Sequence, residues 1–149
     1  MPFYFKGIQM FKKLLISLGI LFWSQNIFSE SNLDHHCLAT MMYHEAKGEG
    51  QIGQVAVANV VINRTKTKIF PKSVCDVIYQ KGQFSWVGKK KKINDAQTYE
   101  RLLNLAKNVL YNDDTDHTNG ALYFNGKNQR PPTKNLRVRA KIGNHIFYS

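Results

Sequence analysis

The stretch from Gln51 to Lys66 constrains the fold of this chain more than any other part. Its apolar residues lie on most faces of a helix, and they include Val55, Ala56, Ala58, Val60 and Ile62. A helix that is apolar nearly all round has to be buried by the rest of its domain. We therefore expect residues 51–66 to form a central helix around which the other elements pack.

A helix is predicted just before this stretch, over residues 33–47. Its apolar residues recur at helical spacing and are Leu33, Cys37, Leu38, Met41, Met42 and Ala46. Asp34 is the expected N-cap, because its short side chain can accept a hydrogen bond from a free N–H of the first helical turn. Gly48 and Gly50 are expected to end this helix, since glycine is a poor helix former.

Two further helices are expected after the central one. A turn at Phe70 and Pro71 leads to a short helix that Ser73 caps and that runs through Tyr79. Residues 82–94 are expected to form a loop or hairpin. Asp95 then begins an amphipathic helix, whose apolar stripe consists of Tyr99, Leu102, Leu103, Ala106, Val109 and Leu110.

The C-terminal part is expected to add a small sheet. Residues 121–124 and 142–148 resemble strands, and a basic, proline-containing segment separates them. A mostly helical pattern with a few strands indicates an α+β domain. With 43% hydrophobic residues and no repeat or long linker, residues 30–149 are expected to form one such domain.

The N-terminal residues have the pattern of a secretory signal peptide. Lys12 and Lys13 precede an almost wholly apolar run over residues 14–23, and a small residue follows at Ser29. About ten apolar residues are too few to span a bilayer comfortably, which takes about 20. We therefore predict a signal peptide over residues 1–29, with Met10 as a candidate start, and export to the periplasm or the cell wall. An N-terminal core helix and a retained membrane anchor are the alternatives.

The formal net charge of the chain is +11, and residues 30–149 carry +8 of it, because residues 1–29 contain three lysines and no acid. A basic protein seeks anionic partners, but charge does not say which. Export favours polymers of the cell envelope, so we expect no nucleic-acid partner and contact with a membrane only through the signal segment. The lysine run over residues 89–92 is expected to be a solvated loop. We expect a monomer.

Cys37 and Cys75 are the only cysteines, and both follow the predicted signal peptide. In an oxidising compartment such a pair is expected to form a disulfide. It would close a loop of about 39 residues and stabilise the fold by about 3–4 kcal/mol on the chain-entropy model. Two buried free thiols are the alternative.

Two acidic side chains near the end of the first helix are candidates for catalysis. Glu45 lies near the helix C-terminus, where the helix dipole disfavours a negative charge and so raises the pKa of a carboxyl group. An acid that is still protonated near neutral pH can protonate a glycosidic oxygen. On these arguments alone, a surface glutamate is the simpler interpretation. Glu49 follows after Gly48, and it either has a functional role or holds the glycine-rich turn.

No metal or cofactor site is predicted. Three histidines precede or adjoin Glu45, namely His35, His36 and His44, but they do not form HExxH or another known ligand spacing. The side-chain types of a catalytic triad are present as Ser85, His145 and Asp76. The chain lacks the GxSxG motif that would support such a triad, and a cysteine nucleophile would compete with the disulfide.

Several separated motifs resemble one known family. Residues 43–64 read YHEAKGEGQIGQVAVANVVINR, and residues 70–80 and 83–86 read FPKSVCDVIYQ and QFSW. Residues 120–125 read GALYFN, and residues 142–148 read IGNHIFY. In this order, and over nearly the whole chain after the predicted signal peptide, the motifs resemble the SleB-type cell-wall hydrolases, the family of spore-cortex-lytic enzymes. The small exported or phage-associated branch of that family is the most similar.

The resemblance implies a lysozyme-like, mostly helical domain that cleaves peptidoglycan between N-acetylmuramic acid and N-acetylglucosamine. The catalytic glutamate of the family falls on Glu45. As in lytic transglycosylases, it would protonate the leaving oxygen and then remove a proton from the 6-hydroxyl group of the sugar, which closes a 1,6-anhydro ring. The N-acetyl group of the substrate can assist, so neither a second carboxylate nor a cofactor is needed.

Further side chains are expected to line the glycan groove beside Glu45. Sugar sites combine amide and hydroxyl groups with an aromatic face. On this basis the predicted substrate-binding residues are Glu49, Gln83, Phe84, Ser85, Tyr123 and Asn125.

The chain also departs from the spore enzymes of the family. No separate peptidoglycan-binding domain is expected, so specificity for spore cortex is not implied. Basic residues could hold the anionic glycan in its place, namely Lys134, Arg137, Arg139 and Lys141. A hydrolytic muramidase that uses water is one alternative. A catalytically idle wall-binding protein is another, although the presence of Glu45 argues against it.

Overall fold

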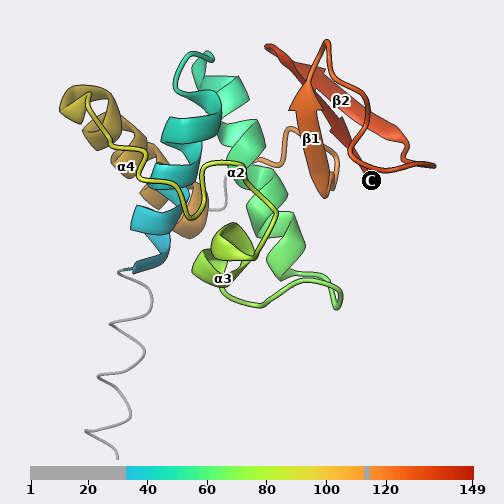
Figure 1. Cartoon of the computed structure of the whole chain (residues 1–149), viewed down its shortest axis with the longest axis horizontal. Helices are drawn as coiled ribbons and strands as arrows, with labels where there is room; N and C mark the ends of the chain where they lie inside the picture. Colours follow the sequence, from blue (N-terminus) through green and yellow to red (C-terminus); the bar gives the residue numbers. More distant parts are fainter. Residues whose placement is uncertain (1–32, 113–114) are drawn as a thin grey trace, which may run out of the picture. The chain divides into compact units, whose positions relative to one another are not determined.

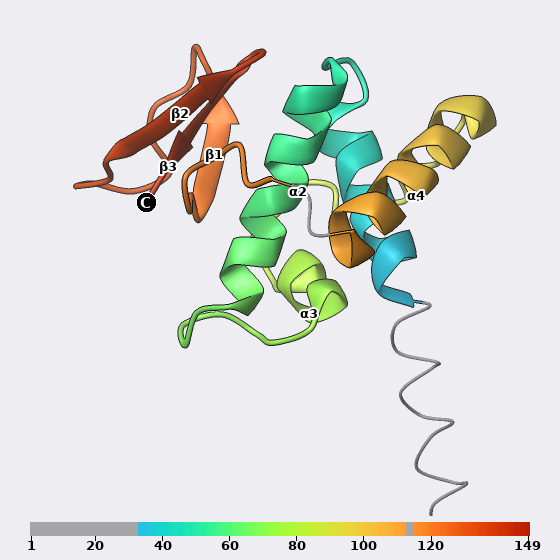
Figure 2. The same cartoon turned by 180° about the vertical axis from the view of Figure 1, so that it is seen from behind.

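Helix α2, Gln51–Thr65, lies at the centre of the fold, as its apolar composition predicts. Its buried side chains include Val55, Ala56, Val57, Ala58, Val60 and Val61. In both views the helix stands between the sheet and the other long helices (Figures 1 and 2). The computed structural model describes residues 33–112 and 115–149, and the signal peptide predicted over residues 1–29 lies outside the described residues.

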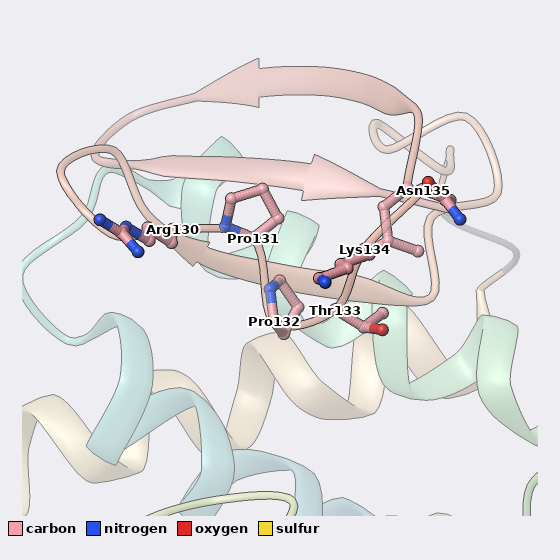
Figure 3. A pocket seen from close by; sticks show the side chains of 7 residues that line it. Arg130, Pro131, Pro132, Thr133, Lys134 and Asn135 are labelled. Carbon is pink, nitrogen blue, oxygen red and sulfur yellow. The ribbon is translucent and has the colours of Figure 1, made fainter.

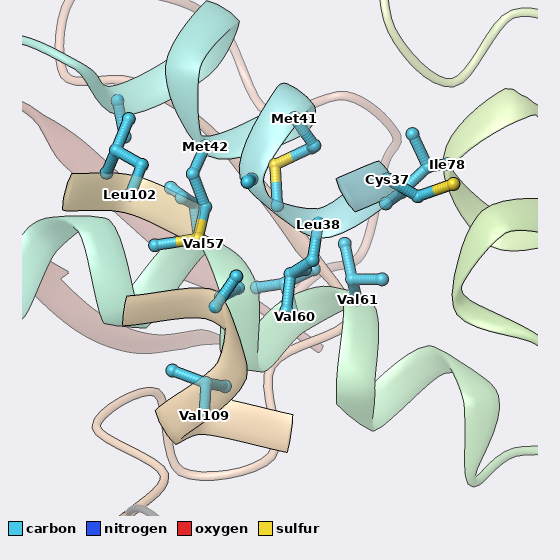
Figure 4. Packing of buried hydrophobic residues seen from close by; sticks show 14 of the residues in the cluster. Cys37, Leu38, Met41, Met42, Val57, Val60, Val61, Ile78, Leu102 and Val109 are labelled. Atoms are coloured by element: carbon cyan, nitrogen blue, oxygen red, sulfur yellow. The ribbon is translucent and has the colours of Figure 1, made fainter. Parts of the chain in front are cut away.

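Three helices pack around α2. They are a helix over residues 33–46, α3 (Val74–Tyr79) and α4 (Ala96–Tyr111). Figure 4 shows how their side chains meet, with Leu38, Met41, Met42, Val57, Val60, Val61, Leu102 and Val109 in one cluster. Burying one such side chain fully stabilises the fold by about 1.5–3 kcal/mol. In the described ranges, no helix has both the length and the apolar character needed to cross a membrane.

The predicted Ser73 cap is confirmed, and Asp95 caps the helix that it was predicted to begin. Ser73 accepts a hydrogen bond from the backbone N–H of Asp76 (3.1 Å) at the start of α3. Asp95 accepts one from the backbone N–H of Thr98 (2.9 Å) at the start of α4. A cap of this kind satisfies an N–H group that has no partner within the helix.

The first helix is joined to α3 by a covalent and a polar contact. Cys37 and Cys75 form the predicted disulfide. The carboxylate of Asp34 accepts a hydrogen bond from the backbone N–H of Cys75 (3.3 Å). The prediction that Asp34 is an N-cap is wrong, because Leu33 is already helical and Asp34 lies inside the helix. Its side chain serves a tertiary contact.

The C-terminal part forms an antiparallel sheet in the order β1–β3–β2. The strands are β1 (Tyr123–Gly126), β2 (Val138–Ile142) and β3 (His145–Tyr148). Strand β3 therefore lies in the middle, and its Phe147 and Tyr148 are buried. The mostly helical α+β fold class predicted from the sequence is confirmed.

One strand prediction is wrong and one strand was missed. The strand predicted over residues 142–148 is divided by a turn at Gly143 and Asn144. Gly143 has a φ of 56°, in the left-handed region that favours glycine. Strand β2 was missed because it is an edge strand with exposed basic residues, Arg139 and Lys141, and an irregular register. Its side chains alternate too weakly to be recognised.

Candidate active site

Glu45 is the next-to-last residue of the helix over residues 33–46, and its side chain is half-buried. The indole Nε1 of Trp86 donates a hydrogen bond to Oε1 of Glu45 (2.8 Å). Burial raises the pKa of Glu45 above its ordinary value. The Trp86 hydrogen bond and the charge of Lys91 oppose this effect, but the net shift is upward. Glu45 therefore keeps its proton to a higher pH than an exposed glutamate does.

Trp86 is held in place by aromatic rings on two sides. Its ring stacks on Phe84 (ring centroids 5.9 Å apart) and lies against His44 (4.7 Å). The segment turns back on itself through hydrogen bonds between backbone groups, including Lys89 N–H to the carbonyl of Trp86 (3.0 Å). Trp86 was not among the predicted site residues. One signal could have found it, since an indole N–H is only a donor and requires a partner when it is buried.

The predicted groove residues of the 82–94 loop lie next to Trp86. Phe84 is buried, and its ring contacts Trp86 and also Phe124 of β1 (6.3 Å). Gln83 is half-buried and Ser85 is exposed. The structure therefore places Phe84 in a row of rings that connects the sheet to Glu45.

The predicted residues of β1 have other surroundings. The Tyr123 ring lies 6.2 Å from the ring of Phe70 and 5.6 Å from the Arg64 guanidinium carbon. The Nδ2 group of Asn125 donates a hydrogen bond to the carbonyl of Arg130 in the β1–β2 connection. The Oδ1 atom of Asn125 is buried without a hydrogen-bond partner. Tyr123 and Asn125, two residues apart, lie on the same face of the strand.

Glu49 is engaged by the turn between β2 and β3. Its Oε2 accepts a hydrogen bond from the backbone N–H of Asn144 (3.1 Å), and its Oε1 accepts one from Asn144 Nδ2 (3.0 Å). His145 Nδ1 lies 3.8 Å from Oε1. A Cβ atom on Gly143 would lie 1.9 Å from Oε2, and the φ of Gly143 is 56°, so another residue there would displace the Glu49 carboxylate and strain the backbone. The sequence left open whether Glu49 holds a turn. It does hold one, although not the glycine-rich turn that was considered.

Arg64 is a buried residue that sequence reasoning missed. Its Nε donates a hydrogen bond to the carbonyl of Leu122 (2.7 Å), just before β1. Its guanidinium group also lies over the ring of Phe70 (5.0 Å). Burial lowers the pKa of Arg64 to about 10. A basic residue in the last turn of a helix is normally expected in solvent, so its role in joining α2 to β1 emerged only from the fold.

One hollow lies in the β1–β2 connection. It has a volume of about 620 Å³ and is lined by residues 130–136 (Figure 3). All lining residues come from one connection, and none is an acid. This hollow therefore contains no carboxyl group of the kind found at Glu45. Another hollow, of about 240 Å³, lies at the end of the helix that carries Glu45.

Residues 33–112 and 115–149 contain no group of three His, Cys, Asp or Glu side chains that could hold a metal ion. The expectation that the chain uses no metal or cofactor stays a prediction.

Comparison with known proteins supplies independent information. The model of the Cell Wall Hydrolase family matches residues 48–148. The spore cortex-lytic enzyme of Bacillus subtilis (strain 168) is 36% identical over 121 residues, which cover 78% of this chain and 38% of the enzyme. The corresponding enzyme of Bacillus cereus is 33% identical over 127 residues, which cover 44% of its length. The chain thus spans less than half the length of these relatives.

Solved structures give the same result for the fold. The catalytic domain of the germination-specific lytic transglycosylase SleB from Bacillus anthracis has a TM-score of 0.63 and 31% identity, and the match covers 78% of this chain and 93% of that domain. The catalytic domain of the Bacillus cereus SleB protein has a TM-score of 0.61 and 30% identity, with 89% of that domain covered. The family model, the relatives and the shared fold agree with the motif resemblance. The chain belongs to the Cell Wall Hydrolase family.

Proposed function

We propose that this chain degrades peptidoglycan as a lytic transglycosylase. It would cleave the bond between N-acetylmuramic acid and N-acetylglucosamine, with Glu45 as general acid and then general base. The observation that carries the proposal is the half-buried carboxyl group of Glu45, which has a raised pKa and a hydrogen bond from Trp86. The family of the chain, and its similarity to a domain described as a lytic transglycosylase, support the same reaction.

The Trp86 hydrogen bond indicates which oxygen of Glu45 carries the proton. An indole N–H can only donate, so Oε1 acts as the acceptor and Oε2 holds the proton. Oε2 gives this proton to the glycosidic oxygen while the bond from that oxygen to C1 of the muramic acid breaks. The leaving sugar departs with a free 4-hydroxyl group. The Glu45 carboxylate then takes the proton of the 6-hydroxyl group, whose oxygen bonds to C1.

The engagement of Glu49 favours the 6-hydroxyl group over water as the nucleophile. Both carboxylate oxygens of Glu49 accept hydrogen bonds from Asn144. This supports a role in holding the turn and not in activating water. An intramolecular hydroxyl group can have an effective concentration of about 10⁵ M or more. It is therefore the better-placed nucleophile where no base is positioned for water.

The products of digestion test this proposal directly. We expect muropeptides with 1,6-anhydromuramic acid ends, each lighter by one water than the corresponding reducing-end product. Mass spectrometry of fragments released from purified peptidoglycan by residues 30–149 measures the ratio of the two ends. Dominant reducing ends would identify a hydrolytic muramidase, and no released fragments at all would contradict the proposed enzyme activity.

Trp86→Phe is expected to move the basic limb of the pH–rate profile to higher pH. The protonated form of Glu45 starts the reaction, so the rate falls when rising pH removes the proton. The Trp86 hydrogen bond lowers the pKa of Glu45, whereas burial raises it. When the hydrogen bond is removed, the effect of burial is less strongly opposed, so the pKa rises further. The smaller ring would also cost on the order of 1–2 kcal/mol of stability.

The rate of peptidoglycan lysis from about pH 4 to pH 9 measures this shift. Tyr79→Phe is the matched control, because Tyr79 contacts the Trp86 ring (6.1 Å) but makes no hydrogen bond to Glu45 among those observed. A basic limb that stays in place or moves to lower pH in Trp86→Phe would contradict the role of the indole.

The remaining predictions are retained as parts of this proposal. Gln83, Ser85, Tyr123 and Asn125 are proposed to contact the glycan, with Phe84 as the aromatic face. Export of the domain is supported by its disulfide, since such bonds persist mainly in oxidising compartments. The peptidoglycan of the cell envelope is the proposed partner.

A further inference from the structure

A pocket of about 240 Å³ lies at the end of the helix that carries Glu45, and it has no role in the reaction described above. It is lined by Tyr43, His44, Lys47, Lys91, Lys92 and Asn94. The first three flank Glu45 in the chain, and the others come from the loop before α4. His44 lies against Trp86 (4.7 Å), which holds the Glu45 carboxyl group. Glu45 is not a lining residue, but the charge of the lining residue Lys91 acts on its carboxyl group, so a group bound in this pocket would be within reach of a substrate held at Glu45.

The two sides of the pocket are fixed relative to each other by Tyr43. This side chain is 1% exposed. Its hydroxyl group donates a hydrogen bond to Oδ1 of Asn94 (2.7 Å) and accepts from the backbone N–H groups of Asn94 (3.3 Å) and Asp95 (3.2 Å). The pocket is thus built on a buried contact between the first helix and the loop, and is formed before a ligand arrives.

The charge of the pocket is positive. Three lysines line it, and none of its lining residues is an acid. Burial lowers the pKa of His44, and the charges of Lys91 and Lys47 lower it further, so both ammonium groups act on this space. The charge of Lys47 also contributes to lowering the pKa of Asp95. Both carboxylate oxygens of Asp95, however, are already engaged by hydrogen bonds from Thr98 (2.9 and 2.6 Å). The lining groups therefore attract an anion.

The four lysines over residues 89–92 differ in their position relative to the pocket. All four side chains are exposed, in agreement with the expectation of a solvated loop. Only Lys91 and Lys92 line the pocket, whereas Lys89 and Lys90 do not. The chain thus provides two pairs of neighbouring lysines with equal charge and different surroundings.

We propose that this pocket binds a free carboxylate of the peptide stem on the muramic acid residue at the cleavage site. The inference rests on the proposed function and adds a substrate requirement to it. The stem is attached to the lactyl group of muramic acid, so it departs from the glycan close to the bond that Glu45 would cleave. A volume of about 240 Å³ is smaller than most pockets that enclose a whole ligand, which hold about 300–1,000 Å³. It suits the end of a short side chain better than a sugar ring.

The test compares two forms of one substrate. Peptidoglycan stripped of phosphate-containing polymers is used as isolated, or after its carboxylates have been converted to carboxamides. We expect the wild-type protein to cleave the isolated form about three- to tenfold faster at low substrate concentration, as two partly exposed charge contacts would provide. Lys47→Gln combined with Lys92→Gln should lower the rate on the isolated form toward that on the amidated form, with a smaller effect on the latter.

The matched control is Lys89→Gln combined with Lys90→Gln, which removes the same charge from outside the pocket. It should keep the wild-type preference. Lys91 stays intact in both variants, because its charge also acts on Glu45. Equal cleavage of both forms by the wild type, or an equal loss in the two double variants, would overturn the inference. Failure of the wild type to cleave either form would instead refute the proposed function, and the inference with it.

Discussion

Glu45→Gln is expected to lower the rate of peptidoglycan lysis by about 100–10,000-fold and to leave the domain folded. The amide has the shape of the carboxyl group, and its oxygen can still accept the hydrogen bond from Trp86 Nε1. It cannot give a proton to the glycosidic oxygen or take one from the 6-hydroxyl group. Release of soluble fragments from purified peptidoglycan measures the rate, and thermal unfolding monitors the fold.

Glu100→Gln is the matched control for this substitution. Glu100 is also a helical glutamate, but it is exposed on α4. The control should retain the wild-type rate and the wild-type midpoint of unfolding. A folded Glu45→Gln protein with nearly the wild-type rate would show that Glu45 is not the catalytic acid.

Loss of the disulfide is expected to destabilise the domain by about 3–4 kcal/mol on the chain-entropy model, because the bond closes a long loop. For a domain of this size, that corresponds to a decrease of the unfolding midpoint on the order of 10–20 °C. Replacing Cys37 and Cys75 together by alanine should show this decrease in thermal unfolding. Thiol titration of the unreduced, unfolded wild type should find no free thiol.

A reducing agent separates the effect of the bond from that of the lost sulfur atoms. It should lower the unfolding midpoint of the wild type and leave that of the double alanine variant unchanged. Two titratable thiols in the unreduced wild type, or a midpoint insensitive to reduction, would contradict the presence of a stabilising disulfide.

The elements that were predicted correctly have strong local signals. The valine- and alanine-rich α2 is apolar on most faces, and Ser73 and Asp95 stand where a cap is needed. The sequence signals failed where a residue or segment has a tertiary role that differs from its local preference. Asp34 has the side chain of an N-cap but serves a hydrogen bond to Cys75. Strand β2 has the composition of a loop and is a strand because β3 provides its hydrogen-bond partners.

The same division applies to the candidate site. The position of Glu45 near a helix end was evident from the sequence, and the motif resemblance selected it as the catalytic residue. The side chain that contacts it was not evident, because Trp86 lies about 40 residues away in the chain and only the fold brings it to Glu45. Glu49 looked like a possible partner of Glu45 until the β2–β3 turn was seen to engage both of its oxygens.

The sequence by itself determined the buried central helix, the helical domain with a small sheet, the family and the residue proposed to transfer the proton. These follow from periodicity, capping residues and motifs, all of which act over a few neighbouring residues. Only the tertiary structure decided what surrounds that residue: the Trp86 donor, the Arg64 link to β1, and a pocket shared by Lys47 and Lys92. Desolvation, hydrogen bonding and charge at a site depend on which distant segments meet there, and no local pattern encodes that meeting.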